Sequence, residues 1–459
     1  MPAEAVEALY RERMMTTSRT WRAPIGRALT LALVTAGMAA LAAQTPPVTT
    51  SGWPQWGGPD RNFMSGATGL ADAWPTDGPP VLWSRTLGLG HSSIVADQGM
   101  LYTLYRPGKQ VSRTGPWERE EIVVAIDAAT GKTVWEHRYP SEPFDFSQGP
   151  GPHSTPLVAG DRLFATGTNK QVHALDTRTG KLLWAVDLVK DHGAPPRLIR
   201  PAVKAGYAVS PLAYRDTIIL QAGGTGQAVM ALSQRDGSVV WKSGDFLVSE
   251  SSPILIDVDG QTQAVVFAAQ AVYGLDPGTG RILWSHAHDT QGDMNNSTPI
   301  WGPDNVLIVS SGYNQGTRAL RLARKGDTTS VEELWFSSRM KIMFANALWL
   351  GDHLYATHGD FGPAVMTALN VKTGDVVWQE RGFGRSSFVH ADGKAIVIDE
   401  DGDLALVRLS PDGMTVISQA RIFDSVSWTA PTLVGTTLYA RDRQKIVALD
   451  VGERAGGRR

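Results

Sequence analysis

Eight residues stand at one position of a recurring element, three residues before its proline slot. They are His91, His153, Ala208, Glu250, Asn296, Phe344, Arg385 and Trp428. Two imidazoles, a carboxylate, an amide and a guanidinium, brought together, could bind a metal ion, an anionic cofactor or a sugar. The neighbouring Tyr207, Asn295 and Asn346 could add hydrogen bonds. The alternative is a solvated channel mouth, in which the two histidines only cap strands.

Other groups of reactive residues have simpler interpretations. In "SHAHD", His286 and His288 are spaced like a metal-binding pair, but they directly follow Trp284, and we interpret them as a strand end. "DEDGD" (residues 399–403) resembles the start of a calcium loop, yet it lacks the later glutamate and lies at a hairpin turn. The sequence has no P-loop, dinucleotide fingerprint or GxSxG motif.

The element that carries the eight residues is an apolar hairpin, as in "HSTPLVAGDRLFAT" and "TAPTLVGTTLYA". A second repeat keeps the same period: "ALDTRTGKLLW" (residues 174–184) has near-copies in "AIDAATGKTVW", "GLDPGTGRILW" and "ALNVKTGDVVW". Its tryptophan slots are Trp83, Trp135, Trp184, Trp241, Trp284, Trp335 and Trp378, 43 to 57 residues apart, with an eighth slot near Ile417 that has lost its tryptophan. A four-stranded propeller blade takes roughly this length, about 40 to 50 residues.

We therefore predict an all-β, eight-bladed β-propeller of four-stranded antiparallel blades. The 48 glycines, 27 prolines and 15 tryptophans suit many short strands joined by tight turns. The "PVLWSRTL" strand (residues 80–87) should complete the last blade and close the ring. The eight pre-proline positions, which we call the ring residues, then meet at the central axis. We predict a binding funnel there made by His91, His153, Glu250, Asn296, Arg385 and Trp428, without catalytic residues or metal ligands.

The repeated hairpin has a physical explanation that involves no cofactor. Asp176, Thr177 and Thr179 can bond to local backbone amides, and Gly180 can supply a positive φ in the turn. The tryptophan that ends the motif should pack between blades, where burying about 200 Å² of aromatic surface stabilises the fold by several kcal/mol.

The chain divides into four predicted parts. Residues 1–45 resemble an export signal, with Met14 or Met15 as an alternative start, and residues 46–79 form a Trp/Gly/Pro-rich strap over the propeller. The propeller spans residues 80–452, and residues 453–459 form a disordered tail. The absence of cysteine excludes disulfides and a lipid anchor, and the formal net charge of -2 does not favour nucleic acid. We expect a periplasmic or secreted protein without a membrane span.

The motifs "ALDxxTGxxxW" and "SSPxxxxGxxY" resemble the pyrroloquinoline-quinone (PQQ) repeat of quinoprotein-type propellers, over Pro80–Asp450. The "WPQWGGPDRN" sequence also resembles an exported subgroup of these proteins. The resemblance implies one of two functions. One branch contains quinone- and calcium-dependent alcohol and sugar dehydrogenases. The other contains scaffolds such as the propeller lipoprotein of the outer-membrane β-barrel assembly machine.

The departures from the dehydrogenase branch favour the scaffold. Those enzymes resemble one another in a vicinal disulfide over the quinone, which a chain without cysteine cannot form. We predict a non-catalytic binding or scaffolding protein of the cell envelope, with a protein partner or a small molecule at the funnel and no assigned cofactor. The alternative is a dehydrogenase that uses PQQ and calcium, in which Arg385 pairs with a quinone carboxylate and a ring histidine or glutamate is the base.

Overall fold

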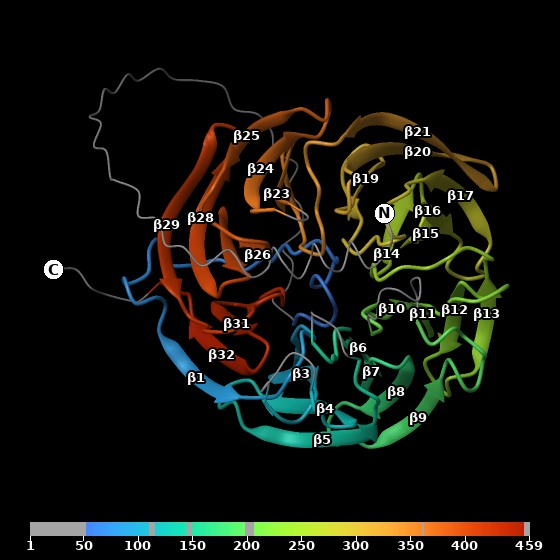
Figure 1. Ribbon diagram of the computed structural model, residues 1–459, viewed down its shortest axis with the longest axis horizontal. Coiled ribbons are helices and arrows are strands. Elements are labelled where there is room, and N and C mark those ends of the chain that lie inside the picture. Colours follow the sequence, from blue (N-terminus) through green and yellow to red (C-terminus); the bar gives the residue numbers. More distant parts are fainter. Residues whose placement is uncertain (1–51, 110–114, 145–148, 198–205, 360–361, 454–459) are drawn as a thin grey trace.

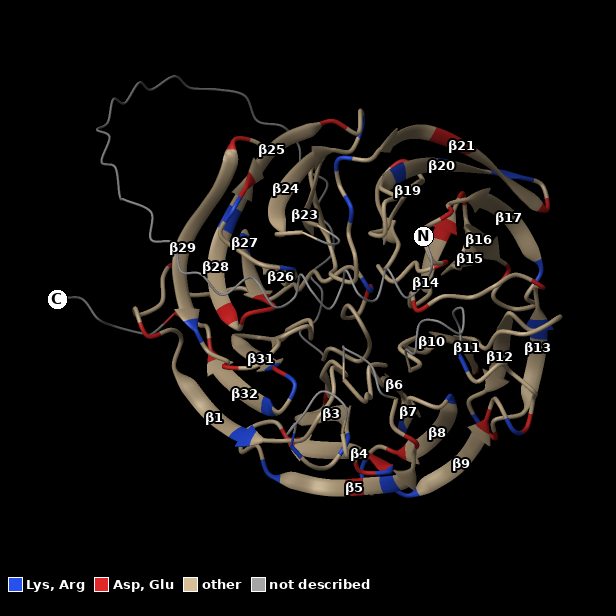
Figure 2. Ribbon diagram, viewed as in Figure 1, with Lys and Arg blue, Asp and Glu red and all other residues tan. Residues whose placement is uncertain are grey.

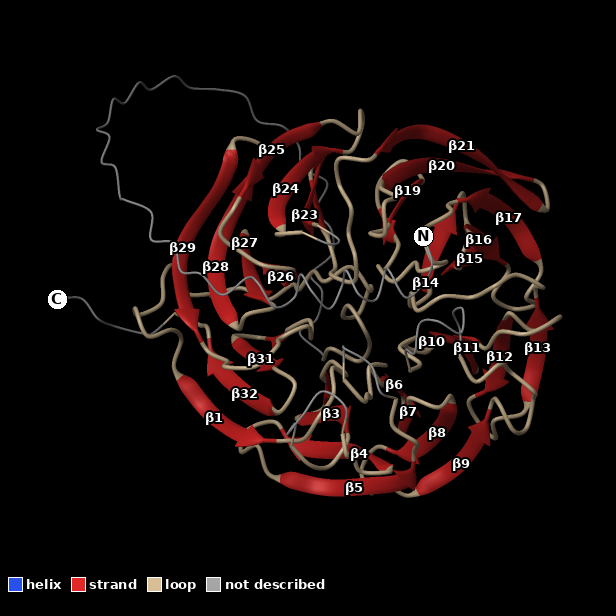
Figure 3. Ribbon diagram, viewed as in Figure 1, coloured by secondary structure: helices blue, strands red, loops and turns tan. Residues whose placement is uncertain are grey.

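The computed structural model describes residues 52–109, 115–144, 149–197, 206–359 and 362–453. These residues form eight four-stranded antiparallel sheets arranged around a central axis (Figure 1). Figure 3 shows strands and loops throughout the described part of the chain. The predicted eight-bladed propeller is confirmed. The predicted export signal and most of the predicted tail lie outside the described residues.

Each of the first seven blades uses four consecutive strands. Blades 1 and 2 contain β2 (Val95–Asp97), β3 (Met100–Tyr105), β4 (Glu120–Asp127) and β5 (Thr133–Pro140), then β6 (Leu157–Ala159), β7 (Arg162–Thr166), β8 (Gln171–Asp176) and β9 (Leu182–Asp187). Blades 3 and 4 contain β10 (Leu212–Tyr214), β11 (Thr217–Gln221), β12 (Val229–Ser233) and β13 (Val239–Ser243), then β14 (Ile254–Val258), β15 (Gln261–Phe267), β16 (Ala271–Leu275) and β17 (Ile282–Ala287). Blades 5 and 6 contain β18 (Ile300–Trp301), β19 (Val306–Ser310), β20 (Thr317–Lys325) and β21 (Thr328–Ser337), then β22 (Leu348–Leu350), β23 (His353–His358), β24 (Val365–Asn370) and β25 (Val376–Glu380). Blade 7 contains β26 (Ser386–Ala391), β27 (Lys394–Asp399), β28 (Asp403–Ser410) and β29 (Gly413–Arg421).

Blade 8 joins the two ends of the propeller. Its inner three strands are β30 (Thr432–Val434), β31 (Thr437–Arg441) and β32 (Lys445–Asp450), and its outer strand is β1 (Val81–Thr86). Strand β1 pairs antiparallel with β32, and Trp83 lies opposite Ala448. In Figure 1 the blue β1 lies beside the red β32. The predicted closure by the N-terminal strand is confirmed.

The repeated tryptophans connect each blade to the next. The Trp135 indole on β5 donates to the carbonyl of Thr177 in blade 2 at 2.9 Å, and its ring lies against Gly180. Trp83, Trp184, Trp241, Trp335 and Trp378 make the same kind of bond to the next blade, at 2.8 to 3.1 Å. The predicted packing of tryptophan between blades is confirmed at these positions.

Trp284 is the exception to this pattern. The outer hairpin of blade 5, β20–β21, turns at Gly326 and does not present the "TG" turn on which a neighbouring indole could rest. The Trp284 indole instead donates to the side chain of Gln263 in its own blade, at 2.7 Å. A Cβ on Gly274 would meet that indole, which explains why this copy reads "GLD" rather than "ALD".

The "TG" turn also behaves as expected, with one correction. Asp176 Oδ1 accepts the backbone N–H of Thr179 at 2.8 Å, and Gly180 has φ 69°. The Thr177 hydroxyl does not bond to an amide; it donates to the carbonyl of Asp161 at 3.2 Å, because the turn packs against the β6–β7 turn of the same blade.

Residues 53–65 of the strap lie against inner strands, and residues 70–78 continue past the end of β32 to β29, the outer strand of blade 7. The Trp53 backbone exchanges two hydrogen bonds with Ala96 on β2, at 2.6 and 2.9 Å. The His390 backbone on β26 bonds to Phe63 and Ser65 in the same way, at 3.0 and 2.8 Å. In Figure 1 this blue segment crosses the middle of the disc. The strap therefore connects blade 1 with blade 7, the two blades on either side of blade 8.

Candidate functional site

The "SSP" element places the ring residues by connecting neighbouring blades. The Ser93 amide of blade 1 donates to the Thr155 hydroxyl of blade 2 at 3.1 Å, and the Thr155 amide donates to Ser210 of blade 3 at 3.0 Å. The Ser210 amide continues the series to Ser252 of blade 4 at 2.9 Å. These hydroxyls satisfy backbone donors that no strand partner reaches. The element is thus structural, and each ring residue lies just before it.

Four ring residues form a continuous row of aromatic side chains. The ring centroids of Phe344 and Trp428 are 5.2 Å apart, those of Trp428 and His91 are 5.2 Å apart, and those of His91 and His153 are 5.6 Å apart. The two imidazoles are stacked, with 11° between their planes. The row joins blades 6, 8, 1 and 2. The structure therefore brings these four predicted side chains together.

Arg385 and Trp428 share a partner that sequence reasoning missed. Glu400, which follows β27, pairs with the Arg385 guanidinium at 2.9 Å and accepts the Trp428 indole N–H at 3.1 Å. Arg443 is a second missed residue: its Nε donates to His91 Nε2 at 3.2 Å, and its guanidinium lies over the Trp428 ring. Neither belongs to a repeated motif, so their spacing carries no signal.

The other predicted residues form separate groups. Asn296 donates to the Tyr313 hydroxyl at 3.4 Å. Glu250 Oε2 accepts the Ala208 amide at 2.7 Å, whereas its Oε1 has no hydrogen-bond partner among the described residues. Contacts therefore link Ala208 to Glu250 and Asn296 to Tyr313, apart from the aromatic row.

The His153 imidazole is held neutral by its surroundings. Burial and the nearby Arg443 charge lower the pKa of His153 to about 4. His91 Nε2 accepts a hydrogen bond from Arg443, so this nitrogen does not face an open site. The described residues include no group of three or more His, Asp or Glu side chains that could hold a metal ion. The pair suits stacking and hydrogen bonding rather than acid–base chemistry at neutral pH.

The sequence model of a family described as the outer membrane protein assembly factor BamB matches residues 119–380. The chain belongs to this family.

Two curated BamB proteins show how far the similarity extends. The BamB of Yersinia pestis is 22% identical over 371 residues, which cover 80% of this chain and 77% of that protein. The BamB of Escherichia coli K12 is 23% identical over 370 residues, which cover 71% of this chain and 87% of that protein. This BamB-family chain thus resembles most of the length of both.

Solved structures share the fold of this BamB-family chain. The BamB of Moraxella catarrhalis has a TM-score of 0.57 at 17% identity, covering 82% of this chain and 99% of that one. A quinohemoprotein alcohol dehydrogenase from Comamonas testosteroni has the same TM-score at 11% identity, covering 90% of this chain and 82% of that one. The propeller alone does not separate the two functions.

Glu250 should make the stability of the protein depend on pH. Burial raises the pKa of Glu250 to about 7, from 4.5, so the folded state holds a proton that the unfolded state releases. Its contribution is present below pH 4.5 and is lost as the pH rises through 7. The nearby Lys170 has a pKa lowered to about 7 by burial, so its opposite effect begins above that pH.

We therefore expect the free energy of unfolding of the wild type to fall by about 2 kcal/mol between pH 4.5 and 7.5 because of this group. Glu250→Gln should not show this fall. Urea denaturation of the wild type and the variant across this range measures the difference. The exposed Asp77→Asn variant is the control and should follow the wild type. Parallel curves for wild type and Glu250→Gln would contradict the prediction.

Proposed function

We propose that this chain is a non-catalytic scaffold of the cell envelope that binds a protein partner in outer-membrane protein assembly. The observation that carries the proposal is the BamB family match over residues 119–380, extended by the similarity to curated assembly factors over most of the chain. The buried polar groups that connect the blades, such as Glu121 of blade 1 with Thr168 of blade 2, bind each other, as a rigid scaffold requires. None of the described residues forms a helix able to cross a membrane.

Two measurements test the scaffold. Deleting the gene should lower the amount of folded β-barrel protein in the outer membrane, and the intact gene should restore it. The purified chain should also bind the isolated periplasmic domains of the assembly machine in calorimetry. Unchanged barrel levels together with no binding would exclude the proposed function. An exported reporter fusion that stays in the cytoplasm would exclude the envelope location.

The described residues do not fit the alternative, a dehydrogenase that uses PQQ and calcium. Arg385, which would have to pair with a quinone carboxylate, is already paired with Glu400 at 2.9 Å. Trp428, at the same position on the axis, contacts Phe344 and His91 on either side. We expect no thermal shift and no dye-coupled alcohol or sugar oxidation with quinone and calcium. Saturable oxidation would instead support the enzyme.

The axial funnel remains a candidate for a small ligand, because Glu250 Oε1 is a buried acceptor that no other described residue reaches with a hydrogen bond. Glu250 is 9% exposed, and an acceptor at this depth is costly to leave without a donor. We propose that a ligand with a hydroxyl or amine donor binds there. Calorimetry with monosaccharides and primary amines tests the proposal. Affinity that is unchanged in Glu250→Gln would assign the ligand to another site.

A further inference from the structure

A groove of about 530 Å³ lies between the strap and the inner strands of blades 3 to 5. Its apolar lining includes Leu212, Ile254, Leu255, Ile300 and Trp301. The carboxylates of Asp60 on the strap and Asp257 on β14 lie at its rim and are exposed. None of the eight ring residues lines the groove, although Thr298 and Asn346, each two residues after a ring residue, do.

The strap shows how this face binds an extended chain. Trp53 pairs with Ala96 on β2, Pro54 accepts the Val158 amide of β6 at 2.8 Å, and Phe63 pairs with His390 on β26. In each case the backbone of the strap uses the inner edge of a blade. The inner strands of blades 1, 2 and 7 are therefore occupied by an extended segment of the same protein.

The inner edges of blades 4 and 5 are not used in this way. Strands β14 and β18 each lie at the edge of their sheet, and no backbone hydrogen bond joins them to the strap within the described residues. Among the described residues, the strap hydrogen-bonds to blades 3 and 4 through the Arg61 side chain, which donates to the carbonyls of Pro211 and Pro253. It reaches blade 5 through the Trp56 indole, which donates to the Thr298 hydroxyl at 2.8 Å. Unpaired strand edges bind extended peptides through main-chain hydrogen bonds.

The charges beside the groove indicate what the bound segment carries. The Arg61 guanidinium is buried and is directed at carbonyl oxygens and at Gln55, and burial lowers its pKa to about 9. The carboxylates of Asp60 and Asp257 remain exposed at the rim. Figure 2 shows acidic and basic residues interspersed around the disc, so a pair of carboxylates beside an apolar floor is a local feature.

We propose that this groove binds an extended segment of a partner protein, with apolar side chains on the floor and a lysine or arginine beside Asp60 and Asp257. The segment pairs with the edge of β14 as the strap pairs with β2 and β26. This inference rests on the proposed function and names the chemistry of the partner. Polar and apolar contacts together then give specificity, and the backbone bonds give affinity.

Peptide binding to the full chain tests the inference. The probe is an octapeptide of alternating valine and threonine with a lysine at each end, followed by fluorescence anisotropy. We expect binding that weakens at least tenfold when glutamate replaces lysine, and at least tenfold when the threonine amides are methylated. Equal binding of the lysine and glutamate peptides, or no binding of the lysine peptide at millimolar concentration, would overturn the inference.

Substitutions locate the binding site. Asp257→Lys and Asp60→Lys should each weaken the lysine peptide at least tenfold, whereas Asp77→Lys makes the same charge change on the strap outside the groove and should not. Asp60 and Asp77 are exposed, so the unfolding midpoints of their variants should stay near the wild type. Asp257 Oδ1 accepts the Gly260 amide at 2.8 Å, so Asp257→Lys should also lower the free energy of unfolding by about 1 kcal/mol, and its peptide binding is measured well below its unfolding midpoint. Unchanged peptide affinity in both groove variants would assign the peptide to another surface. If the variants still bind the protein partner, the groove inference is wrong and the proposed function stands. If the wild type does not bind the partner, the proposed function is wrong.

Discussion

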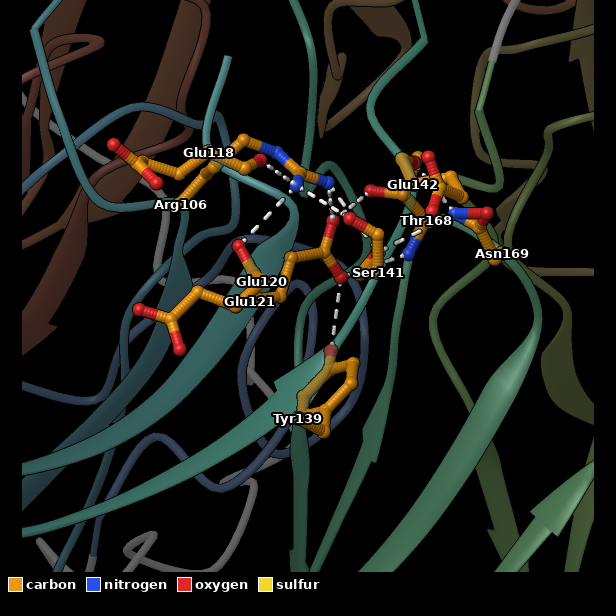
Figure 4. A network of polar contacts seen from close by, with 9 residues as sticks. All are labelled: Arg106, Glu118, Glu120, Glu121, Tyr139, Ser141, Glu142, Thr168 and Asn169. Atoms are coloured by element: carbon orange, nitrogen blue, oxygen red, sulfur yellow. Dashed lines mark hydrogen bonds and ion pairs between the residues drawn. The ribbon is translucent and has the colours of Figure 1, made fainter.

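Replacing Glu121 by glutamine is expected to lower the free energy of unfolding by about 3–5 kcal/mol, the cost of breaking a buried ion pair. The Glu121 and Arg106 side chains are fully buried and pair at 2.8 Å. Arg106 also donates to the carbonyls of Glu118 and Ser141, at 2.6 and 2.8 Å (Figure 4). The guanidinium keeps these bonds in the variant but loses the carboxylate that neutralises its charge.

The geometry around Glu121 also excludes a simple replacement by an amide. Its Oε1 accepts from Arg106 and from the Thr168 hydroxyl, and its Oε2 accepts from the Tyr139 hydroxyl at 2.9 Å and the Thr168 amide at 3.0 Å. A glutamine presents an oxygen on only one side, so its NH₂ group must face donors on the other. Because Thr168 belongs to blade 2, the variant also weakens the contact between blades 1 and 2.

Denaturation at constant pH measures this loss, and Glu142→Gln is the matched control. Glu142 pairs with Arg119 on the surface, where the side chains are 60% and 74% exposed. An exposed pair contributes about 0–1 kcal/mol. A similar, small change in both variants would show that the buried pair does not stabilise the junction of the blades.

The second large effect is expected from Gly180→Ala, which should lower the free energy of unfolding by about 3 kcal/mol. Gly180 has φ 69°, and a Cβ there would lie 2.5 Å from Cδ2 of Trp135. The indole cannot easily move away, because its N–H is bonded to Thr177 at 2.9 Å. The substitution therefore combines a strained backbone with a clash between two blades.

Gly160→Ala separates the two contributions. Gly160 has φ 62°, close to that of Gly180, but a Cβ there meets no atom within 4 Å. Its substitution should cost about 1 kcal/mol from the backbone alone. Denaturation curves of the two variants give the cost of the clash by difference. Equal losses would mean that the tryptophan does not require a glycine at this turn.

The fold could be predicted because the same turn and packing residues recur at a regular spacing along the chain. Most copies supply a turn glycine and a tryptophan for the next blade. Where Trp284 departs from this pattern, Gly274 leaves the space that its indole occupies. The candidate site could be predicted only in part. The position of the ring residues in the repeat places His91 and Trp428 near the axis, and their rings are 5.2 Å apart.

The partners of the ring residues could not be found in this way. Glu400 and Arg443 come from loops whose sequences do not repeat, and they reach the axis through contacts far apart in the chain. Lys170 is buried beside the carbonyls of Pro195 and Ala222, where a sequence pattern would place an exposed lysine. Long-range polar pairs depend on tertiary packing, which residue spacing does not encode.

The pairing of β1 with β32 has a consequence for how the protein folds. Strand β1 is synthesised before the other 31 strands of the described chain, and it can pair only after β32, the last of them, has been made. Closing a chain of this length costs roughly 5 kcal/mol of entropy, which only the completed blade offsets. Until then β1 and β31 lack the strand that lies between them in the closed blade, and their edges are unpaired. Closure is thus a late and slow step, and a nascent or truncated chain is the form most exposed to aggregation and proteolysis.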